Sequence, residues 1–324
     1  MVGGGSWATA LVKVLNENKH AVDWWIRDPK IVEHLKTEAS NPDYLSSVKF
    51  SSELISPSGD LEKIFSANEI IVLAVPSAYL KNVIGKLPVK HFKDKIVISA
   101  IKGMIPEENL LIAEYLEKYF SVKEKNIVNI SGPSHAEEVG LEKLSYLTLA
   151  SRSEAEAKRA CELFACNYIR CSSSDDVYGT EYAAVLKNIY AITAGIFHGL
   201  GYGDNFHAVL ISNAIEEMER FLKAVHPITR YINDSPYLGD LLVTAYSQFS
   251  RNRTLGTMIG KGYSVKNALL EMNMVAEGFN ASKCMHIINE SVHADMPIAE
   301  TVYNILWSNV SAEVGFKKIE EALV

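Results

Sequence analysis

Three groups of polar residues in the second half of the chain could transfer a proton and bind an anion. Lys187 lies on a predicted helix whose alanines recur along one face, and Asp240 follows Gly239. A positioned lysine can give a proton to the alkoxide that forms when a ketone accepts hydride. Residues 250–253 (Ser-Arg-Asn-Arg) offer two guanidinium groups, which suit a phosphate. Each group also has a structural interpretation: tight helix packing with a snorkelling lysine, a turn with a helix cap, and a basic helix start at the surface.

The pKa of Lys187 decides whether its amine could exchange a proton near neutral pH. A free lysine has a pKa of about 10.4, which is too high for an efficient base at neutral pH. Burial or nearby cations would lower the pKa of Lys187, whereas the negative charge of Asp240 would raise it. The sequence leaves this balance open.

The chain begins with a glycine-rich turn that fits the dinucleotide-binding pattern G-x-G-x-x-A. The residues are Gly3-Gly4-Gly5-Ser6-Trp7-Ala8, and an apolar helical face follows at residues 11–15. In this pattern Gly3 permits the tight turn, Gly5 lets backbone N–H groups approach the pyrophosphate, and Ala8 keeps the helix close to the sheet. The sequence therefore predicts a site for NAD(H) or NADP(H) at this turn.

The strand that should precede the turn is reduced to Met1 and Val2. In a doubly wound sheet the first strand is central, with a hydrogen-bonded neighbour on each side. Strands have a typical length of about five residues. We therefore expect the natural protein to begin several residues upstream, with an apolar β-branched run. The alternative is that another segment fills this place in the sheet.

The residue that reads the adenosine ribose should follow the next predicted strand, about twenty residues after the turn. That strand ends in Arg27 and Asp28. Arg27 could pair with a 2′-phosphate, which favours NADP(H) over NAD(H). Asp28 could instead neutralise Arg27 or accept a hydrogen bond from the ribose. A solvated turn without a role in recognition is the structural alternative.

Strand and helix patterns alternate in the first half of the chain. Strands are predicted at residues 21–27, 69–75, 95–100, 126–131 and 145–150, and helices at residues 61–67, 78–87, 108–120 and 154–164. This alternation is typical of a parallel sheet with helices on both faces. After Gly179 the pattern is almost entirely helical. The sequence therefore predicts an α/β fold: a Rossmann-like, doubly wound NAD(P)-binding domain at residues 1–178, followed by an all-helical substrate-binding domain at residues 179–324.

Composition excludes several classes of partner. The net charge of −7 argues against nucleic acid and anionic membranes. No apolar run reaches membrane-spanning length, and the first residues do not form a signal peptide. The four cysteines do not form a disulfide or zinc pattern, so we expect buried thiols in a reducing, cytoplasmic compartment. No metal site is expected, because His135, His198 and His207 lack carboxylates at ligand spacing.

Six motifs, in order along the chain, together resemble one enzyme family. They are the turn at residues 3–8, Ser-Ala-Ile-Lys-Gly at 99–103, Ser-Gly-Pro-Ser-His-Ala at 131–136, Lys-Asn at 187–188, Gly-Asp-Leu-Leu at 239–242 with Ser-Arg-Asn-Arg at 250–253, and Met-Val-Ala-Glu-Gly at 274–278. This set resembles the bacterial NAD(P)-dependent glycerol-3-phosphate dehydrogenases. The resemblance implies reversible reduction of dihydroxyacetone phosphate to sn-glycerol 3-phosphate, for phospholipid and carbohydrate metabolism.

The resemblance also assigns roles to individual residues. It makes Lys187 the proton donor or acceptor, with Asp240 as its charged partner. The cofactor residues that it implies are Gly3, Gly5, Ser6, Trp7, Arg27, Lys102, Ala136, Arg251, Val275 and Glu277. The substrate residues that it implies are Lys102, Gly132, Ser134, Lys187, Asp240, Ser250, Arg251 and Asn252. A homodimer stays open as the oligomeric state.

The chain departs from the family pattern at three places. Ile101 replaces the usual threonine, the segment 212–220 lacks the usual arginine near its start, and the segment 227–236 is altered. Two other functions stay open. One is another lysine-dependent ketoacid reductase, of the β-hydroxyacid dehydrogenase or ketopantoate reductase type. The other is an NADP sensor without turnover, which would not need the amine of Lys187.

Overall fold

A computed structural model describes residues 1–272 and 274–323, which form two compact units. The first unit contains residues 1–101 and 112–177, and the second contains residues 102–111 and the chain from Tyr178 onward. The sequence analysis divides the chain once, after residue 178. The structure differs at residues 102–111, which leave the first unit after its fourth strand and pack with the second.

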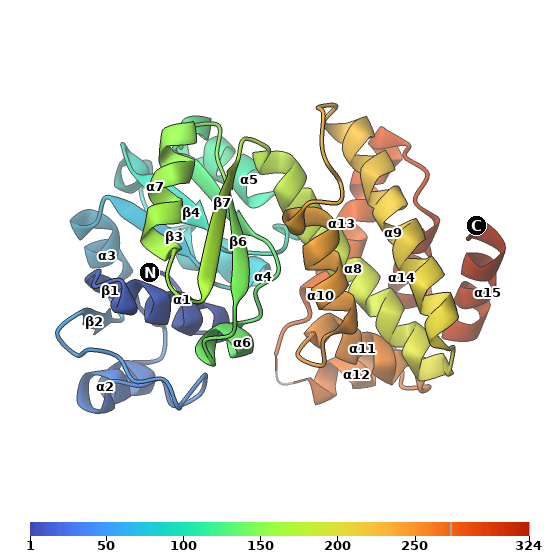
Figure 1. The fold of residues 1–324 in the computed structure, drawn as a ribbon, viewed down its shortest axis with the longest axis horizontal. Helices are drawn as coiled ribbons and strands as arrows, with labels where there is room; N and C mark the ends of the chain where they lie inside the picture. Colours follow the sequence, from blue (N-terminus) through green and yellow to red (C-terminus); the bar gives the residue numbers. More distant parts are fainter. Residues whose placement is uncertain (273, 324) are drawn as a thin grey trace. The chain divides into compact units, whose positions relative to one another are not determined.

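The first unit is an α/β unit (Figure 1). Its strands are β1 (Val22–Trp25), β2 (Ile55–Ser58), β3 (Ile70–Leu73), β4 (Ile96–Ser99), β5 (Ile127–Ser131), β6 (Ser145–Ala150) and β7 (Ile169–Ser174). Its helices are α1 (Ser6–Glu17), α2 (Pro29–Glu38), α3 (Leu61–Ala67), α4 (Ser77–Ile84), α5 (Ile112–Phe120), α6 (Ala136–Gly140) and α7 (Glu154–Phe164), with 3₁₀ turns η1 (Val89–Phe92) and η2 (Glu124–Asn126). The strands β4 and β5 are buried along their whole length, as expected for strands covered on both faces.

The sheet is parallel from β1 to β5, as the sequence predicts. Strands β1 and β2 form one ladder, and β3, β4 and β5 another. Val2 joins the two ladders, because it forms parallel bridges with Trp25 of β1 and Leu73 of β3. Met1 and Val2 therefore lie at the central position where the sequence analysis expects the first strand. Strand β6 runs antiparallel to β5 and pairs in parallel with β7, so the far edge of the sheet differs from the fully parallel arrangement predicted.

The strand predictions fail only at the two edges of the sheet. All five predicted strands are present, but β2 and β7 were not predicted. Strand β2 contains Pro57, which edge strands tolerate because an outer N–H needs no ladder partner. Strand β7 reads Ile-Arg-Cys-Ser-Ser-Ser and buries little beyond Ile169. Without a hydrophobic alternation, neither segment carries the pattern that identifies a half-buried strand.

The second unit is helical (Figure 1). Its helices are α8 (Val177–Leu200), α9 (Asp204–Val225), α10 (Asp240–Tyr246), α11 (Arg251–Gly260), α12 (Val265–Glu271), α13 (Glu277–Val292), α14 (Pro297–Trp307) and α15 (Ala312–Ala322), with the π turn η3 (Ser235–Gly239) before α10. Helix α8 is the one helix in the described part of the chain that is long and apolar enough to cross a membrane, and 83% of its apolar window is buried inside the protein. Its apolar character is thus that of a core helix, which is apolar on all sides.

The four cysteines form no disulfide with one another, and most of them are not buried. Cys284 is buried, whereas Cys161, Cys166 and Cys171 are half-buried. The prediction of buried thiols is therefore wrong for these three residues. They lie around the edge strand β7 and the end of α7, where one side of the structure is open to solvent.

Candidate active site

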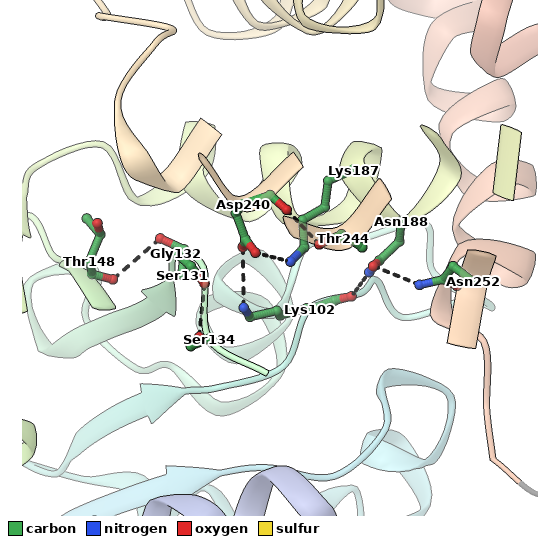
Figure 2. Close-up of polar contacts among 10 residues, drawn as sticks. All are labelled: Lys102, Ser131, Gly132, Ser134, Thr148, Lys187, Asn188, Asp240, Thr244 and Asn252. Carbon is green, nitrogen blue, oxygen red and sulfur yellow. Dashed lines mark hydrogen bonds and ion pairs between the residues drawn. The ribbon is translucent and has the colours of Figure 1, made fainter. Parts of the chain in front are cut away.

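A cluster of three charged side chains lies in the second unit (Figure 2). The ammonium group of Lys187, on α8, forms an ion pair with Oδ1 of Asp240, the first residue of α10. The ammonium group of Lys102 lies 3.3 Å from Oδ2 of the same carboxylate. The side chain of Asp240 is 1% exposed and that of Lys187 is 5% exposed, whereas Lys102 retains 17%. Asp240 thus bridges two cations almost out of contact with water.

Burial decides the balance of pKa shifts that the sequence leaves open. Desolvation is the largest influence on the pKa of Lys187; together with the charge of Lys102 it outweighs the opposing effect of Asp240, so the pKa is lowered to about 7. Burial acts on Asp240 in the opposite sense, but the two lysines outweigh it and lower the pKa of this carboxyl. Asp240 therefore stays ionised, and Lys187 can gain or lose a proton near neutral pH.

A chain of amide hydrogen bonds ties the charged cluster to two other segments, α11 and α13. Asn188, the neighbour of Lys187, donates from Nδ2 to the carbonyl oxygen of Lys102 at 2.7 Å. Asn252 donates to Oδ1 of Asn188 at 2.8 Å (Figure 2). The Oδ1 of Asn252 accepts from the N–H of Gly278 at 2.9 Å. Because every amide atom in this chain has a defined partner, the orientation of each side chain is fixed. Asn188 was quoted in a motif but not predicted as a site residue.

Helices α8 and α11 approach one another closely enough to exclude any side chain at the crossing. Gly256 of α11 lies against the backbone of α8, where an added Cβ would be 2.0 Å from the carbonyl oxygen of Ile192. Gly195 of α8 lies against α11, where an added Cβ would be 2.1 Å from the carbonyl oxygen of Arg253. This contact sets the distance between the two helices and places Asn252 beside Asn188.

The first turn of α11 carries the predicted phosphate-binding residues. Ser250 is buried and caps the helix, with its hydroxyl accepting from the N–H of Arg253 at 3.3 Å. Asn252 is buried in the amide chain, whereas Arg251 is half-buried. Arg253 is half-buried too, so the two arginines are the residues of this motif that retain some exposure to solvent. Asn252 has a structural role, because its amide joins Asn188 to Gly278.

Asp240 is positioned by an irregular helix start. The π turn η3 runs directly into α10, and Thr244 donates to the carbonyl oxygen of Asp240 at 2.6 Å. Single π turns often occur at functional sites, because they rotate one side chain out of the regular helical order. The sequence analysis left a simple turn and cap open here, and the ion pairs of Asp240 show that its carboxylate does more than cap a helix.

The glycine turn of the first unit is built as the pattern predicts. Gly3 has a φ of +132° and lies so close to the sheet that an added Cβ would be 2.3 Å from the carbonyl oxygen of Ala74. Gly5 is the N-cap of α1, and no atom would lie within 4 Å of a Cβ added there. Ser6 is buried and Trp7 is half-buried. The first N–H groups of α1 are those that a helix leaves without internal partners, which suits an anion.

Arg27 and Asp28 follow β1 and lie in different local surroundings. Asp28 is the N-cap of α2, and its Oδ1 accepts from the N–H of Lys30 at 2.8 Å. Arg27 is exposed. One carboxylate oxygen of Asp28 is thus engaged in capping, and both side chains are exposed to solvent.

The segment 131–136 forms a tight turn before a short helix. Gly132 has a φ of +100°, and an added Cβ would lie 2.7 Å from the carbonyl oxygen of Tyr146. Ser134 donates to the carbonyl oxygen of Gly132 at 2.9 Å, and α6 begins only at Ala136.

In the second unit, Val275 is half-buried and Glu277 begins α13, beside Gly278 of the amide chain. No group of three or more metal ligands occurs in the described parts of the chain.

Family profiles match both halves of this chain. The profile described as NAD-dependent glycerol-3-phosphate dehydrogenase N-terminus matches residues 1–157, and the corresponding C-terminus profile matches residues 176–317. The chain belongs to this family. Family membership confirms the resemblance from which the sequence analysis took its expected enzyme class.

Individual members of the family match nearly the whole chain. The glycerol-3-phosphate dehydrogenase [NAD(P)+] of Enterococcus faecalis is 36% identical over 98% of this chain and 94% of its own length. That of Bacillus subtilis is 34% identical over 98% of this chain and 92% of its own. The crystal structure of glycerol-3-phosphate dehydrogenase from Coxiella burnetii has a TM-score of 0.90 at 27% identity, covering 99% of this chain and 97% of that one. The similarity therefore covers both parts of this chain, the α/β part and the helical part.

Proposed function

We propose that this protein is an NAD(P)-dependent glycerol-3-phosphate dehydrogenase, which reversibly reduces dihydroxyacetone phosphate to sn-glycerol 3-phosphate. The observation that carries this proposal is the buried cluster of Lys187, Asp240 and Lys102, in a chain that belongs to the family. Reduction of a ketone requires a group that can release a proton near neutral pH. Burial lowers the pKa of Lys187 to about 7, which suits that task.

Lys187 is the proposed proton donor in the direction of reduction. Hydride for the ketone carbon would come from a nicotinamide cofactor bound at the glycine turn. The ammonium group of Lys187 gives its proton to the ketone oxygen, on which negative charge develops, and becomes a neutral amine. Asp240 holds the amine in place through one carboxylate oxygen. In the direction of oxidation, the neutral amine accepts the hydroxyl proton of the substrate.

The substrate phosphate needs fixed positive charge and hydrogen-bond donors. Arg251 can offer a bidentate guanidinium group from the first turn of α11, and Lys102 can offer a point charge. Ser250 and Asn252 extend the same set on α11, and the family resemblance adds Gly132 and Ser134. This assignment stays a proposal for each residue.

The glycine turn fits a dinucleotide pyrophosphate. The space around Gly5 and the N–H groups at the start of α1 suit a phosphate, and the close contact of Gly3 with Ala74 leaves no room for a side chain. Gly3, Gly5, Ser6 and Trp7 would hold the pyrophosphate. By resemblance, the other cofactor residues are Arg27, Lys102, Ala136, Arg251, Val275 and Glu277. We propose a preference for NADP(H), because Arg27 is exposed while Asp28 caps a helix.

The cellular role follows from the reaction. The product sn-glycerol 3-phosphate carries the glycerol backbone of phospholipids, so we propose a role in phospholipid synthesis in the cytoplasm. No insertion into a membrane and no binding of nucleic acid are needed for it, and the net charge of −7 disfavours nucleic acid and anionic membranes as partners. A homodimer is the proposed assembly if the protein forms an oligomer.

The proposal is tested by a substrate screen that follows NADPH consumption. We expect consumption with dihydroxyacetone phosphate and formation of sn-glycerol 3-phosphate as the product. Turnover of a ketoacid such as ketopantoate, without turnover of dihydroxyacetone phosphate, would instead support the alternative reductases. Binding of NADPH without turnover of any ketone would support the sensor.

A further inference from the structure

All three carbonyl groups of the glycine turn are held by side chains of the first unit. The indole Nε1 of Trp24 donates to the carbonyl oxygen of Gly3 at 2.6 Å. The amide of Asn41 donates to that of Gly4 at 3.0 Å. The hydroxyl of Thr9 donates to that of Gly5 at 2.9 Å. A turn made of three glycines has little conformational preference of its own. These bonds therefore help to orient its peptide groups, together with the backbone bonds from Gly3 N–H to the carbonyl oxygen of Trp25 at 3.1 Å and from Thr9 N–H to that of Gly5 at 2.9 Å.

Asn41 is the central member of this arrangement. It lies in the loop between α2 and β2, and its residue is fully buried. Its Nδ2 donates one hydrogen bond to Gly4 and a second to the hydroxyl of Thr9, at 2.9 Å. Its Oδ1 accepts from the N–H of Asp43 at 3.1 Å, which fixes the amide plane. Asn41 thus reaches two successive carbonyls of the turn, one directly and one through Thr9.

The direction of a carbonyl determines the direction of the next N–H. In a planar trans peptide the C=O of one residue and the N–H of the following residue point in opposite directions. Holding the carbonyl of Gly4 towards Asn41 therefore turns the N–H of Gly5 away from the interior. Holding the carbonyl of Gly5 towards Thr9 does the same for the N–H of Ser6. These are N–H groups at the start of α1, where an anion is favoured.

We propose that Asn41 is a positioning residue for the cofactor pyrophosphate, with Thr9 as its relay. It acts through the backbone of Gly4 and Gly5, and it does not itself contact the cofactor. The inference rests on the proposed function in one respect, namely that a dinucleotide binds at this turn.

The test measures the dissociation constant of NADPH for the full-length protein by cofactor fluorescence. Asn41→Ala should raise this constant about tenfold, the effect of losing one well-placed hydrogen bond, while kcat at saturating NADPH stays close to the wild-type value. Thr9→Val keeps the side-chain shape but removes the relay, and should raise the constant several-fold, about half as far on a logarithmic scale. Thr9→Ser, which retains the hydroxyl, should restore wild-type binding.

Asn18→Ala is the matched control, because it removes a similar amide from the other end of α1. Nδ2 of Asn18 donates to the carbonyl oxygens of Leu163 and Ala165, at 2.9 and 3.0 Å. This variant should lower thermal stability without changing the dissociation constant. Equal NADPH binding by wild type, Asn41→Ala and Thr9→Val would overturn the inference and leave the proposed function standing. A wild-type protein that binds neither NADPH nor NADH would overturn both.

Discussion

The two units solve the problem of binding a charged ligand in different ways. In the first unit, the glycine turn presents backbone N–H groups, and neutral hydrogen bonds from Trp24, Asn41 and Thr9 hold its carbonyls. In the second unit, Lys102, Lys187 and Asp240 place three formal charges together with little exposure to water. Backbone dipoles hold an anion without changing protonation state, whereas buried charges gain altered pKa values. In the proposed function, the glycine turn of the first unit holds the cofactor and the charged cluster of the second unit exchanges a proton.

The charged cluster is costly for stability, which supports a functional reason for it. Removing charges from water has a large desolvation penalty, and a buried ion pair often stabilises a protein no more than apolar residues of the same volume would. The same penalty lowers the pKa of Lys187 to about 7. The property that makes the cluster expensive thus makes the amine useful at neutral pH.

The largest effect is expected for Lys187→Ala. Turnover should fall by about 10² to 10⁴, the usual contribution of a general acid or base, while the dissociation constant of NADPH changes only a few-fold. Steady-state kinetics and cofactor fluorescence measure the two quantities separately. Equal loss of turnover and cofactor binding would mean that the two units do not divide the task as described.

A smaller effect is expected for Arg27→Ala at the end of β1. Loss of a charged hydrogen bond to the 2′-phosphate is worth roughly 1.5–3 kcal/mol, so the KM for NADPH should rise while that for NADH stays nearly constant. The KM for NADH, measured with the same variant, is the control, because NADH lacks the 2′-phosphate. If both KM values rise equally, Arg27 has no part in reading the 2′-phosphate.

One substitution made in both units should have opposite consequences. Gly256→Ala places a methyl group 2.0 Å from the carbonyl oxygen of Ile192, so it should lower the free energy of unfolding by about 1–3 kcal/mol, as overpacking does. Gly5→Ala meets no atom within 4 Å, so the fold should be retained and NADPH binding weakened. Denaturant titration and cofactor fluorescence distinguish these outcomes. Gly203→Ala, also in open space in the second unit, is the control for stability.

Features that depend only on neighbouring residues in the chain could be predicted from the sequence. The glycine turn depends on spacing within six residues, and the inner strands depend on apolar runs, so both were found. The polar edge strands β2 and β7 lack such a signal. The reversal at β6 depends on pairing between distant segments, which no local pattern encodes.

The supporting contacts of the sites could not be predicted for the same reason. Asn41 lies 37 residues from Gly4 in a loop that resembles any other polar loop. Lys102 was recognised as a cation, but its grouping with the second unit follows from the packing of residues 102–111. The pKa of Lys187 depends on how deeply its side chain is buried, and local sequence patterns do not determine that burial.

The central claim is that the fold lowers the pKa of Lys187 into the neutral range, and NMR of isotope-labelled lysine side chains tests it directly. The ammonium signal, assigned by its loss in Lys187→Ala, should titrate at about pH 7 in the free protein. Exposed Lys158, whose pKa is raised by its hydrogen bond and ion pair with Glu154, is the internal reference and should stay protonated far above that pH. Because reduction uses the protonated amine, its rate should decrease above the same pH, whereas that of oxidation should increase. Asp240→Asn should move the midpoint lower still, since Asp240 raises the pKa. A midpoint for Lys187 close to that of Lys158 would contradict the account.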